Sequence, residues 1–215
     1  MRILVFQHAD EEHPGIFRKF LKEDGHEWLA INYHKGEKPP LVDNFDALWV
    51  MGGPMDTWEE AKYPWLKHEK KYIKDAVKMK GIPFLGLCLG HQLLGVSLGG
   101  ECQSSKKSEV GVLDVNLTAE GSSGILFDGF PEKFKCLQWH GAEISKMPEG
   151  GVCLAKSEDC PIQSLKWGTR AYSLQFHLEV ESSTIDDWCG IDIYQKALVD
   201  TLGENGPIKL KKQMN

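Results

Sequence analysis

The 215-residue sequence contains no long hydrophobic run. Its N-terminus offers only four consecutive apolar residues, at positions 3–6, before Gln7 and His8, which is too few for the core of a signal peptide. No later stretch approaches the roughly 18 apolar residues that a helix needs to cross a bilayer. We therefore predict a soluble protein with a cytoplasmic location and no membrane partner.

Paired cysteines are also missing. The six cysteines, at positions 88, 102, 136, 153, 160 and 189, show no CxxC spacing and no compact cluster. Buried, reduced thiols are therefore expected rather than a disulfide framework. The HExxH pattern of zinc hydrolases is absent as well. We predict that the protein uses neither a metal ion nor an organic cofactor.

The sequence has no excess of positive charge. Its 25 Lys and Arg residues face 31 Asp and Glu residues, which gives a formal net charge of −6. The short basic clusters at 67–74 and 209–212 are typical of a solvated helix face or tail. We therefore predict no nucleic-acid partner.

The sequence does contain alternating strand and helix patterns. With 41% apolar and 26% charged residues, the chain can bury a sizeable core, and we predict one domain spanning residues 1–215. In the first half, buried strands alternate with helices, which favours a parallel sheet. In the second half, short strands separated by turns favour antiparallel additions. The predicted fold is an α/β three-layer sandwich with a mainly parallel central sheet. The predicted strands are 2–6, 27–33, 45–54 with its turn, 82–88, 111–118, 134–140, 151–157 and 170–180, and the predicted helices are 15–24, 64–80, one from 89, and 183–202.

One cysteine, Cys88, stands between two glycines where a predicted strand meets a predicted helix. The segment Gly86–Gly90, GLCLG, has the spacing of a nucleophile elbow, in which a sharp turn presents the central side chain at the end of a sheet. The N-terminus of a helix also favours the thiolate, which is the reactive form. The alternative is a small core residue flanked by loop glycines, so the motif needs further support.

A histidine and a carboxylate recur at alternate positions in Leu174–Val180, LQFHLEV. In an extended strand, Gln175, His177 and Glu179 would share one face. A carboxylate beside an imidazole fixes the tautomer of a base that takes a proton from a thiol and gives it to a leaving amine. The alternative is a strand with one polar face.

A third motif, Gly52-Gly53-Pro54, follows the predicted strand that begins near residue 45. A glycine turn at a strand end can leave a backbone N–H free to bind an oxyanion. Gly-Pro is equally a common turn signal.

Together the three motifs resemble the class I, triad-type glutamine amidotransferases. GLCLGHQLLG (86–95), GGP (52–54) and QFHLEV (175–180) occur in the order and at the distances usual for the family, over about residues 45–180. The resemblance implies a flavodoxin-like, three-layer glutaminase fold. It is greatest to the glutaminase part of GMP synthase and its stand-alone relatives.

The resemblance also implies roles for individual residues. Cys88 would be the nucleophile, His177 the acid and base, and Glu179 the residue that orients His177. The backbone N–H groups of Gly53 and Leu89 would form the oxyanion hole. A further group would hold the α-amino and α-carboxylate ends of the substrate: Gln92, Trp139, His140, Gly141 and Ala142.

Two residues depart from the family pattern. Leu178 stands where many members have proline, which keeps the alternation of side chains. Trp139 replaces a smaller polar residue, and its indole would either reshape the pocket or simply pack. His91 has no acidic neighbour in sequence, so we interpret it as a structural residue beneath the elbow. A metal site made of His140, His177 and Glu179 lacks any recognised ligand spacing.

Three functions remain open at this stage. The favoured one is an amide hydrolase that forms a thioester with glutamine or a γ-glutamyl compound, with the alternative that it supplies ammonia to a separate synthetase such as GMP synthase. No P-loop ATP-binding pattern appears in the sequence. The other two are a non-catalytic glutamine-binding regulator and a metal-dependent hydrolase. Because Trp139 alters the pocket, we predict that a γ-glutamyl amide is hydrolysed at least as efficiently as glutamine.

Overall fold

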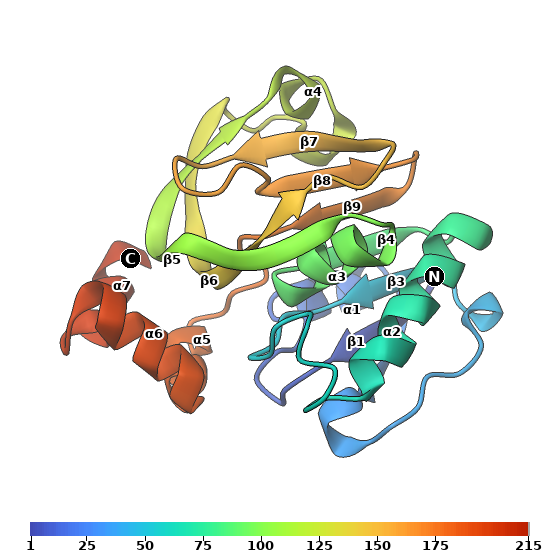
Figure 1. The fold of residues 1–215 in the computed structure, drawn as a ribbon, viewed down its shortest axis with the longest axis horizontal. Helices are drawn as coiled ribbons and strands as arrows, with labels where there is room; N and C mark the ends of the chain where they lie inside the picture. The colour runs from blue at the N-terminus through green and yellow to red at the C-terminus, as the bar shows by residue number, and fades with distance from the viewer. Residues whose placement is uncertain (215) are drawn as a thin grey trace.

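One nine-stranded sheet runs through the computed structural model, which describes residues 1–214 (Figure 1). Asn215, the last residue of the predicted domain, lies outside the described residues. The strand order is β2-β1-β3-β4-β9-β8-β7-β5-β6. The strands are β1 (Arg2–Gln7), β2 (Glu27–Asn32), β3 (Ala47–Val50), β4 (Phe84–Leu87), β5 (Glu101–Leu117), β6 (Lys133–Lys146), β7 (Gly151–Lys156), β8 (Ser164–Trp167) and β9 (Ala171–Leu174).

The sheet has a parallel half and an antiparallel half. The strands β2, β1, β3, β4 and β9 pair in parallel, whereas β8, β7, β5 and β6 pair antiparallel. Parallel neighbours need crossover helices, and the order 2-1-3-4 is that of flavodoxin-like folds. The predicted α/β class, with a parallel sheet and antiparallel additions, is confirmed.

Helices cover both faces of the parallel half of the sheet. In β1, for example, apolar side chains point to both faces, and each face is buried beneath helices. Leu4 and Phe6 belong to the core beneath α2 and α3, while Ile3 and Val5 belong to the core beneath α1. A strand covered on both faces reads as a continuous apolar run. The helices concerned are α1 (Phe17–Glu23), α2 (Trp65–Lys74) with a π-helical turn (Asp75–Met79), and α3 (Leu89–Ser97), and the antiparallel half carries the short α4 (Ala119–Ser122).

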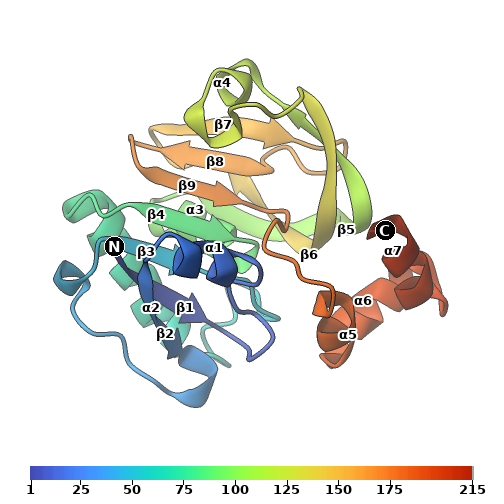
Figure 2. The same cartoon turned by 180° about the vertical axis from the view of Figure 1, so that it is seen from behind.

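Three helices follow the last strand: α5 (Thr184–Cys189), α6 (Asp192–Leu202) and α7 (Gly206–Met214). They lie at one side of the molecule against β5 and β6 (Figure 2). The prediction of one helix over 183–202 followed by a tail was wrong, because Leu210 is fully buried and anchors residues 206–214 as a helix. None of the helices described in residues 1–214 is long and apolar enough to span a membrane.

The predicted strand at 170–180 was wrong beyond residue 174, where β9 ends. Beyond β9 the Gln175 N–H donates to the Gln163 carbonyl oxygen (2.8 Å), and the His177 N–H donates to the Leu137 carbonyl oxygen of β6 (2.9 Å), which makes an isolated antiparallel bridge in place of a continued strand. The short β8 was not predicted, and β5 and β6 extend further than expected. Much of β5 is exposed and polar, so its sequence lacks a clear alternating pattern.

Candidate active site

Cys88 occupies the sharp turn between β4 and α3. Its backbone has φ +49° and ψ −103°, and it is the only non-glycine residue with positive φ among residues 1–214. Such a conformation costs on the order of 1–3 kcal/mol and is concentrated at functional sites. The turn is held by a hydrogen bond from the Cys88 N–H to the Leu174 carbonyl oxygen (2.8 Å), so β9 fixes the position of the cysteine.

The two glycines of the elbow are required by close packing. A Cβ atom on Gly90 would collide with the Val50 carbonyl group, and one on Gly86 would collide with the Gly90 carbonyl group. These contacts bring the start of α3 against the end of β3. The spacing of Gly86 and Gly90 therefore lets the helix begin directly beneath the cysteine.

His177 and Glu179 form a buried pair beside the elbow. The Nδ1 atom of His177 lies 2.7 Å from Oε1 of Glu179, and both side chains are buried. The Nε2 atom of His177 has no partner that meets hydrogen-bond geometry in residues 1–214, and the Cys88 sulfur is the nearby group that acts on the ring. The edge of the His177 ring packs against Trp188 of α5 at a centroid distance of 4.6 Å. One ring nitrogen is thus held by a carboxylate and the other remains open.

The charges around His177 favour its protonated form. Burial alone would lower its pKa, but the negative charge of Glu179 and the nearby Cys88 sulfur raise the pKa well above 6.5. An imidazolium next to the sulfur is the partner that a thiolate nucleophile needs.

The predicted oxyanion residues lie on the same pocket as the cysteine. Gly53 follows β3 and Leu89 is the first residue of α3, and both line the pocket that contains Cys88. Neither backbone N–H donates a hydrogen bond to a backbone carbonyl within residues 1–214. At Leu89 this follows from the helix itself, whose first N–H groups have no carbonyl one turn earlier.

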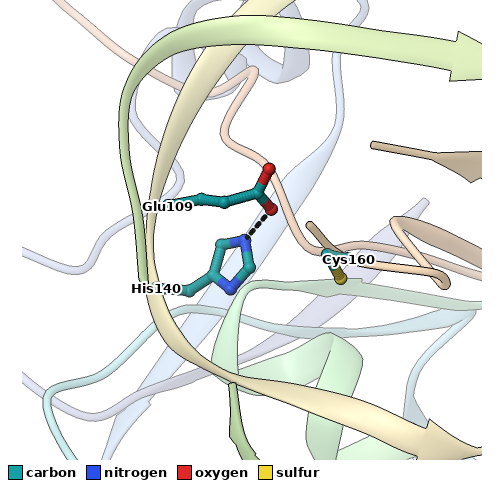
Figure 3. Close-up of side chains that lie close together, drawn as sticks. All are labelled: Glu109, His140 and Cys160. Atoms are coloured by element: carbon teal, nitrogen blue, oxygen red, sulfur yellow. Dashed lines mark ion pairs between the residues drawn. The ribbon is translucent and has the colours of Figure 1, made fainter. Parts of the chain in front are cut away.

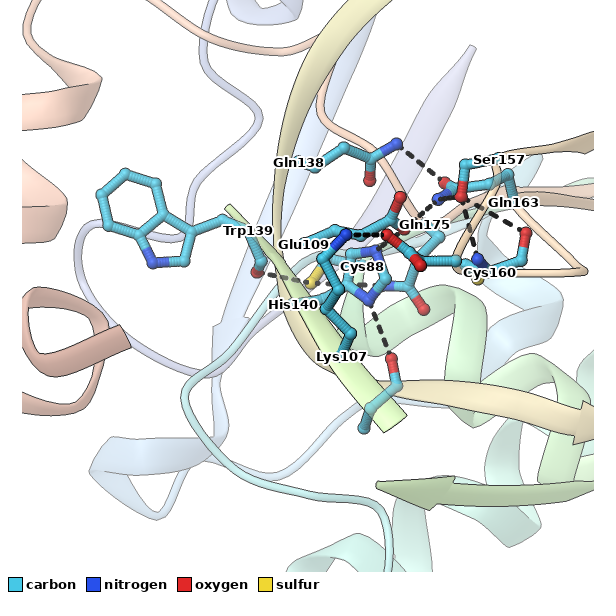
Figure 4. A network of polar contacts seen from close by, with 12 residues as sticks. Cys88, Lys107, Glu109, Gln138, Trp139, His140, Ser157, Cys160, Gln163 and Gln175 are labelled. Carbon is cyan, nitrogen blue, oxygen red and sulfur yellow. Dashed lines mark hydrogen bonds and ion pairs between the residues drawn. The ribbon is translucent and has the colours of Figure 1, made fainter. Parts of the chain in front are cut away.

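Two glutamines connect the pocket wall to the nucleophile, and Figure 4 shows one of them, Gln175, beside Cys88. The Gln92 side-chain amide donates to the Ala142 carbonyl oxygen and to Oε1 of Gln175, each at 3.1 Å. Gln175 in turn donates to the Cys88 sulfur at 3.6 Å. The sequence motif predicts Gln175 on the same face as His177 and assigns it no role. The structure makes it a neighbour of the reacting atom.

The pocket has a volume of about 200 Å³ and includes all the predicted substrate-binding residues. The carbonyl oxygen of Trp139 lies 3.9 Å from the Cys88 sulfur. Its indole turns away from this network (Figure 4) and packs with Trp188 and Tyr194 of the C-terminal helices. Trp139 therefore presents its backbone to the cysteine and joins β6 to α5 and α6 through its ring. The residues that line the pocket are Gly53, Pro54, Met55, Asp56, Cys88, Leu89, Gln92, Ser108, Trp139, His140, Gly141, Ala142, Ile193, Tyr194 and Ala197.

Sequence reasoning missed the contribution of α6 to the pocket. Ile193, Tyr194 and Ala197 form part of its wall, and the Tyr194 hydroxyl donates to the buried carboxylate of Glu12. Burial is the largest effect on Glu12 and raises its pKa. Glu12 and Tyr194 are 182 positions apart, so no local pattern could have paired them.

A second polar cluster lies behind His140 and contains Glu109 and Cys160 (Figure 3). Their potential ligand atoms lie within 4.8 Å of one another. Oε2 of Glu109 lies 3.1 Å from Nε2 of His140 and accepts a hydrogen bond from Gln163 at 2.7 Å. Burial raises the pKa of the Cys160 thiol to about 12, so the thiol is protonated in this arrangement. We interpret the cluster as an ion pair that supports the pocket wall. The metal set considered from sequence, which combined His140 with His177 and Glu179, is not the one grouped here.

His91 lies beneath the elbow and faces away from the chemistry. Nδ1 lies 2.9 Å from the Ser173 hydroxyl and Nε2 lies 3.0 Å from the Ile162 carbonyl oxygen. Burial lowers the pKa of His91 to about 3, so the ring is neutral. This arrangement agrees with the structural role expected from sequence.

Known proteins resemble the chain along most of its length. Residues 21–189 match the family model described as glutamine amidotransferase class-I. A glutamine amidotransferase-like protein of Salmonella typhimurium, YfeJ, is 30% identical over 95% of this chain and 85% of its own length. The GMP synthase of Lactobacillus gasseri is 35% identical over 83% of this chain, which corresponds to 30% of that enzyme.

Solved structures agree with these matches. A glutamine amidotransferase from Thermotoga maritima has a TM-score of 0.86 and 30% identity, covering 99% of this chain and 89% of its own. The protein SMU.1228c has a TM-score of 0.87 and 29% identity, covering 99% of this chain and 92% of its own. The elbow and the glycine turn line one pocket, and with the family-model match and the relatives above, the chain belongs to the class I glutamine amidotransferase family.

Proposed function

We propose that the protein is an amide hydrolase in which Cys88, His177 and Glu179 act as a catalytic triad on glutamine or a γ-glutamyl amide. The observation that carries the proposal is the strained, positive-φ conformation of Cys88 at the start of α3. A packing residue has no reason to be held in a strained conformation at the N-terminus of a helix, whereas a nucleophile gains access and charge stabilisation there. The open Nε2 of His177 supports the same role.

In the first step the Cys88 thiolate attacks the carbon of the γ-amide. A C–S bond forms, and the carbonyl π electrons move to oxygen. The resulting oxyanion lies between the N–H groups of Gly53 and Leu89, which have no other backbone partner. Donors already oriented toward a developing charge stabilise the transition state more than the ground state.

In the second step the His177 imidazolium donates its Nε2 proton to the amide nitrogen, the C–N bond breaks, and the amine leaves. Glu179 accepts a hydrogen bond from Nδ1 and keeps Nε2 directed at the reacting atoms. A thioester remains on Cys88. The neutral histidine then takes a proton from water, which attacks the thioester through a second oxyanion, and the C–S bond breaks to release glutamate.

We place the leaving amine against the wall that α6 contributes. Ile193 is 55% exposed at the pocket and Ala197 lies beside it, so this wall is apolar and open to solvent. The lining contains no lysine or arginine, and Asp56 is its carboxylate. An amine larger than ammonia, neutral or cationic, fits such a wall better than an anionic one.

A specific similarity favours a second candidate function, the supply of ammonia to a synthetase. The matching region of the Lactobacillus gasseri protein belongs to a glutamine-hydrolysing GMP synthase. In that case the isolated chain would be nearly inert and would gain glutaminase activity only with its synthetase. The chemistry at Cys88 would be the same.

The test measures glutamate release by the purified chain from glutamine and from γ-glutamyl-p-nitroanilide. We expect turnover of at least one substrate, loss of it in Cys88→Ala, and a trapped acyl-enzyme on Cys88 by mass spectrometry. Cys102→Ala is the matched control, because Cys102 contacts the Gln92 carbonyl oxygen but lies outside the elbow. Full activity in Cys88→Ala would refute the proposal. Activity that appears only with an added synthetase would select the second function.

A further inference from the structure

His8, on the loop after β1, is held through both ring nitrogens. Nδ1 lies 2.7 Å from the Gly52 carbonyl oxygen, and Nε2 lies 3.0 Å from Oε1 of Glu69 on α2. The side chains of both His8 and Glu69 are completely buried. Because a carbonyl oxygen only accepts hydrogen bonds, Nδ1 must carry a proton and donate it to Gly52. The pair is buried, polar and unused by the mechanism above.

The His8 ring is also fixed in its plane. It stacks on Trp65 at a centroid distance of 5.5 Å and an interplanar angle of 15°, and on Tyr33 at 6.3 Å and 5°. Tyr33 and Trp65 also stack on each other at 5.3 Å, so the three rings form one cluster. The nearby aromatic ring of Trp65 favours a protonated imidazole in addition to restraining it. The ring therefore has one orientation in which both of its donors have partners.

The bond to Gly52 determines the direction of the next N–H group. The structure contains no cis peptide bond in residues 1–214. In a trans peptide the carbonyl oxygen and the following N–H point to opposite sides. When His8 holds the Gly52 carbonyl oxygen, the Gly53 N–H must point away from His8. Gly53 lines the pocket that contains Cys88.

This peptide needs such a restraint because it joins two glycines. Glycine tolerates positive and negative φ about equally, so a Gly-Gly peptide can rotate without a steric penalty from Cβ atoms. Side chains are excluded here, since a Cβ on Gly52 would collide with the Glu12 carboxylate and one on Gly53 would contact His8 and Leu89. Positions 52 and 53 therefore require glycine, and their backbone dihedral angles lack the restraint that a side chain would give.

We infer that His8 and Glu69 are positioning residues that hold the Gly52–Gly53 peptide with its N–H directed into the oxyanion hole. Glu69 orients His8 as Glu179 orients His177, but His8 acts on a backbone carbonyl and never on the substrate. Without His8, the peptide can rotate so that its carbonyl oxygen faces the oxyanion. This inference rests on the proposed function, because it assigns the pair to that reaction.

The test separates oxyanion stabilisation from nucleophile reactivity. Alkylation of Cys88 by iodoacetamide displaces iodide from a tetrahedral carbon and forms no oxyanion, so its rate reports the thiolate alone. His8→Phe keeps a ring and removes both donors. We expect kcat for glutamine and γ-glutamyl-p-nitroanilide to fall about 10²–10³-fold, with KM and the alkylation rate within about threefold of wild type.

Two further variants should lower kcat less than His8→Phe does. His8→Asn places an amide N–H near the position of Nδ1 and should recover at least about tenfold of the lost kcat. Glu69→Gln keeps an acceptor for Nε2 without the charge and should lower kcat about tenfold. Phe127→Leu, a change of a fully buried ring in the core on the α1 face, is the packing control and should leave kcat unchanged.

Unchanged kcat in folded His8→Phe would overturn the inference. A parallel fall in the alkylation rate would also overturn it, because it would indicate general distortion of the elbow. If His8→Phe does not fold, a wild-type kcat in Glu69→Gln would overturn the inference instead. Failure of the proposed function is distinguishable, since Cys88→Ala would then keep its activity. An inactive Cys88→Ala combined with a fully active His8→Phe refutes only the positioning role.

Discussion

Two buried histidine–carboxylate pairs near the pocket differ in what their second ring nitrogen does. In His177–Glu179 the carboxylate holds Nδ1, and Nε2 has no hydrogen bond within residues 1–214. In His8–Glu69 the carboxylate holds Nε2, and Nδ1 is occupied by Gly52. A pair with one open nitrogen can exchange a proton with substrate, whereas a pair with both nitrogens occupied can only fix its partner in place.

A third pair, His140–Glu109, lies between these two cases. Nδ1 of His140 lies 3.0 Å from the Ala142 carbonyl oxygen and Nε2 lies 3.1 Å from the Glu109 carboxylate. Both nitrogens therefore lie near acceptors, but the Nε2 contact with Glu109 lacks hydrogen-bond geometry, unlike the Nε2 contact of His8 with Glu69. Burial next to a carboxylate therefore does not by itself identify a catalytic histidine, and what sets His177 apart is an unoccupied Nε2 together with the nearby Cys88 sulfur.

The largest expected effect on kcat is at His177–Glu179, the pair with an unoccupied ring nitrogen. His177→Ala removes the only proton donor and acceptor of the proposed reaction, so we expect kcat to fall at least about 10⁴-fold, more than in His8→Phe. Steady-state turnover of γ-glutamyl-p-nitroanilide checks this order. A larger fall in kcat in His8→Phe than in His177→Ala would contradict the assignment of His177 as the catalytic histidine and His8 as the positioning one.

Glu179→Gln should have a smaller effect than His177→Ala. The amide can no longer stabilise the imidazolium and can hold the wrong tautomer, yet it transfers no proton itself, so we expect kcat to fall about 10³–10⁴-fold. Single-turnover acylation, monitored by p-nitroaniline release, measures this. Circular dichroism confirms the fold of the variant. Complete inactivity equal to that of His177→Ala would contradict an orienting role.

Glu109→Gln should change binding more than catalysis. Glu109 lies against His140, which lines the pocket and takes no part in the proposed steps. We expect KM to rise about tenfold with kcat within about threefold of wild type. A fall in kcat with an unchanged KM would contradict this prediction, because it would indicate that His140 takes part in the reaction itself.

The pH dependence of stability should sharpen the comparison further. Burial lowers the pKa of both His8 and His177, but their carboxylate partners outweigh it, so both pKa values are raised above 6.5. The folded protein then binds more protons than the unfolded chain. The stabilisation is complete below about pH 6.5 and is lost as pH rises through the raised values.

We therefore expect Tm to fall as pH is increased above about 6.5, and to fall less steeply in His8→Phe, where one of the two groups is absent. Each unit of raised pKa corresponds to about 1.4 kcal/mol, which is a shift of about 2–4 °C per kcal/mol for a chain of this size. Differential scanning calorimetry across this range checks it. Equal slopes in wild type and His8→Phe would show that His8 is not protonated in the folded state.

The smallest effect is expected at the Glu109–His140–Cys160 cluster. Its thiol is protonated and its carboxylate already has partners, so a metal ion is not needed to satisfy it. Treatment with EDTA and the substitution Cys160→Ser should each leave kcat within about twofold of wild type. Loss of activity on chelation, restored by zinc, would revive the metal-dependent alternative.

Local patterns predicted the elements that depend on neighbours in sequence. The apolar runs of β1, β3 and β4 and the spacing of Gly86 and Gly90 around Cys88 are local, so the parallel half and the elbow were predicted. The pairing of His177 with Glu179 was also predicted, although for an incorrect reason. These residues lie beyond the end of β9, and the backbone bond to Leu137 holds them.

By itself, then, the sequence determined the α/β class, the turn at Cys88 and the nearness of His177 to Glu179, because strand burial and glycine spacing act over a few residues. Only the tertiary structure decided that His8 meets Glu69 and Gly52, and that Tyr194 meets Glu12. These contacts join residues 44 to 182 positions apart. Such pairs form because buried polar groups must find partners wherever the packed chain brings them, and one sequence does not reveal which groups will meet.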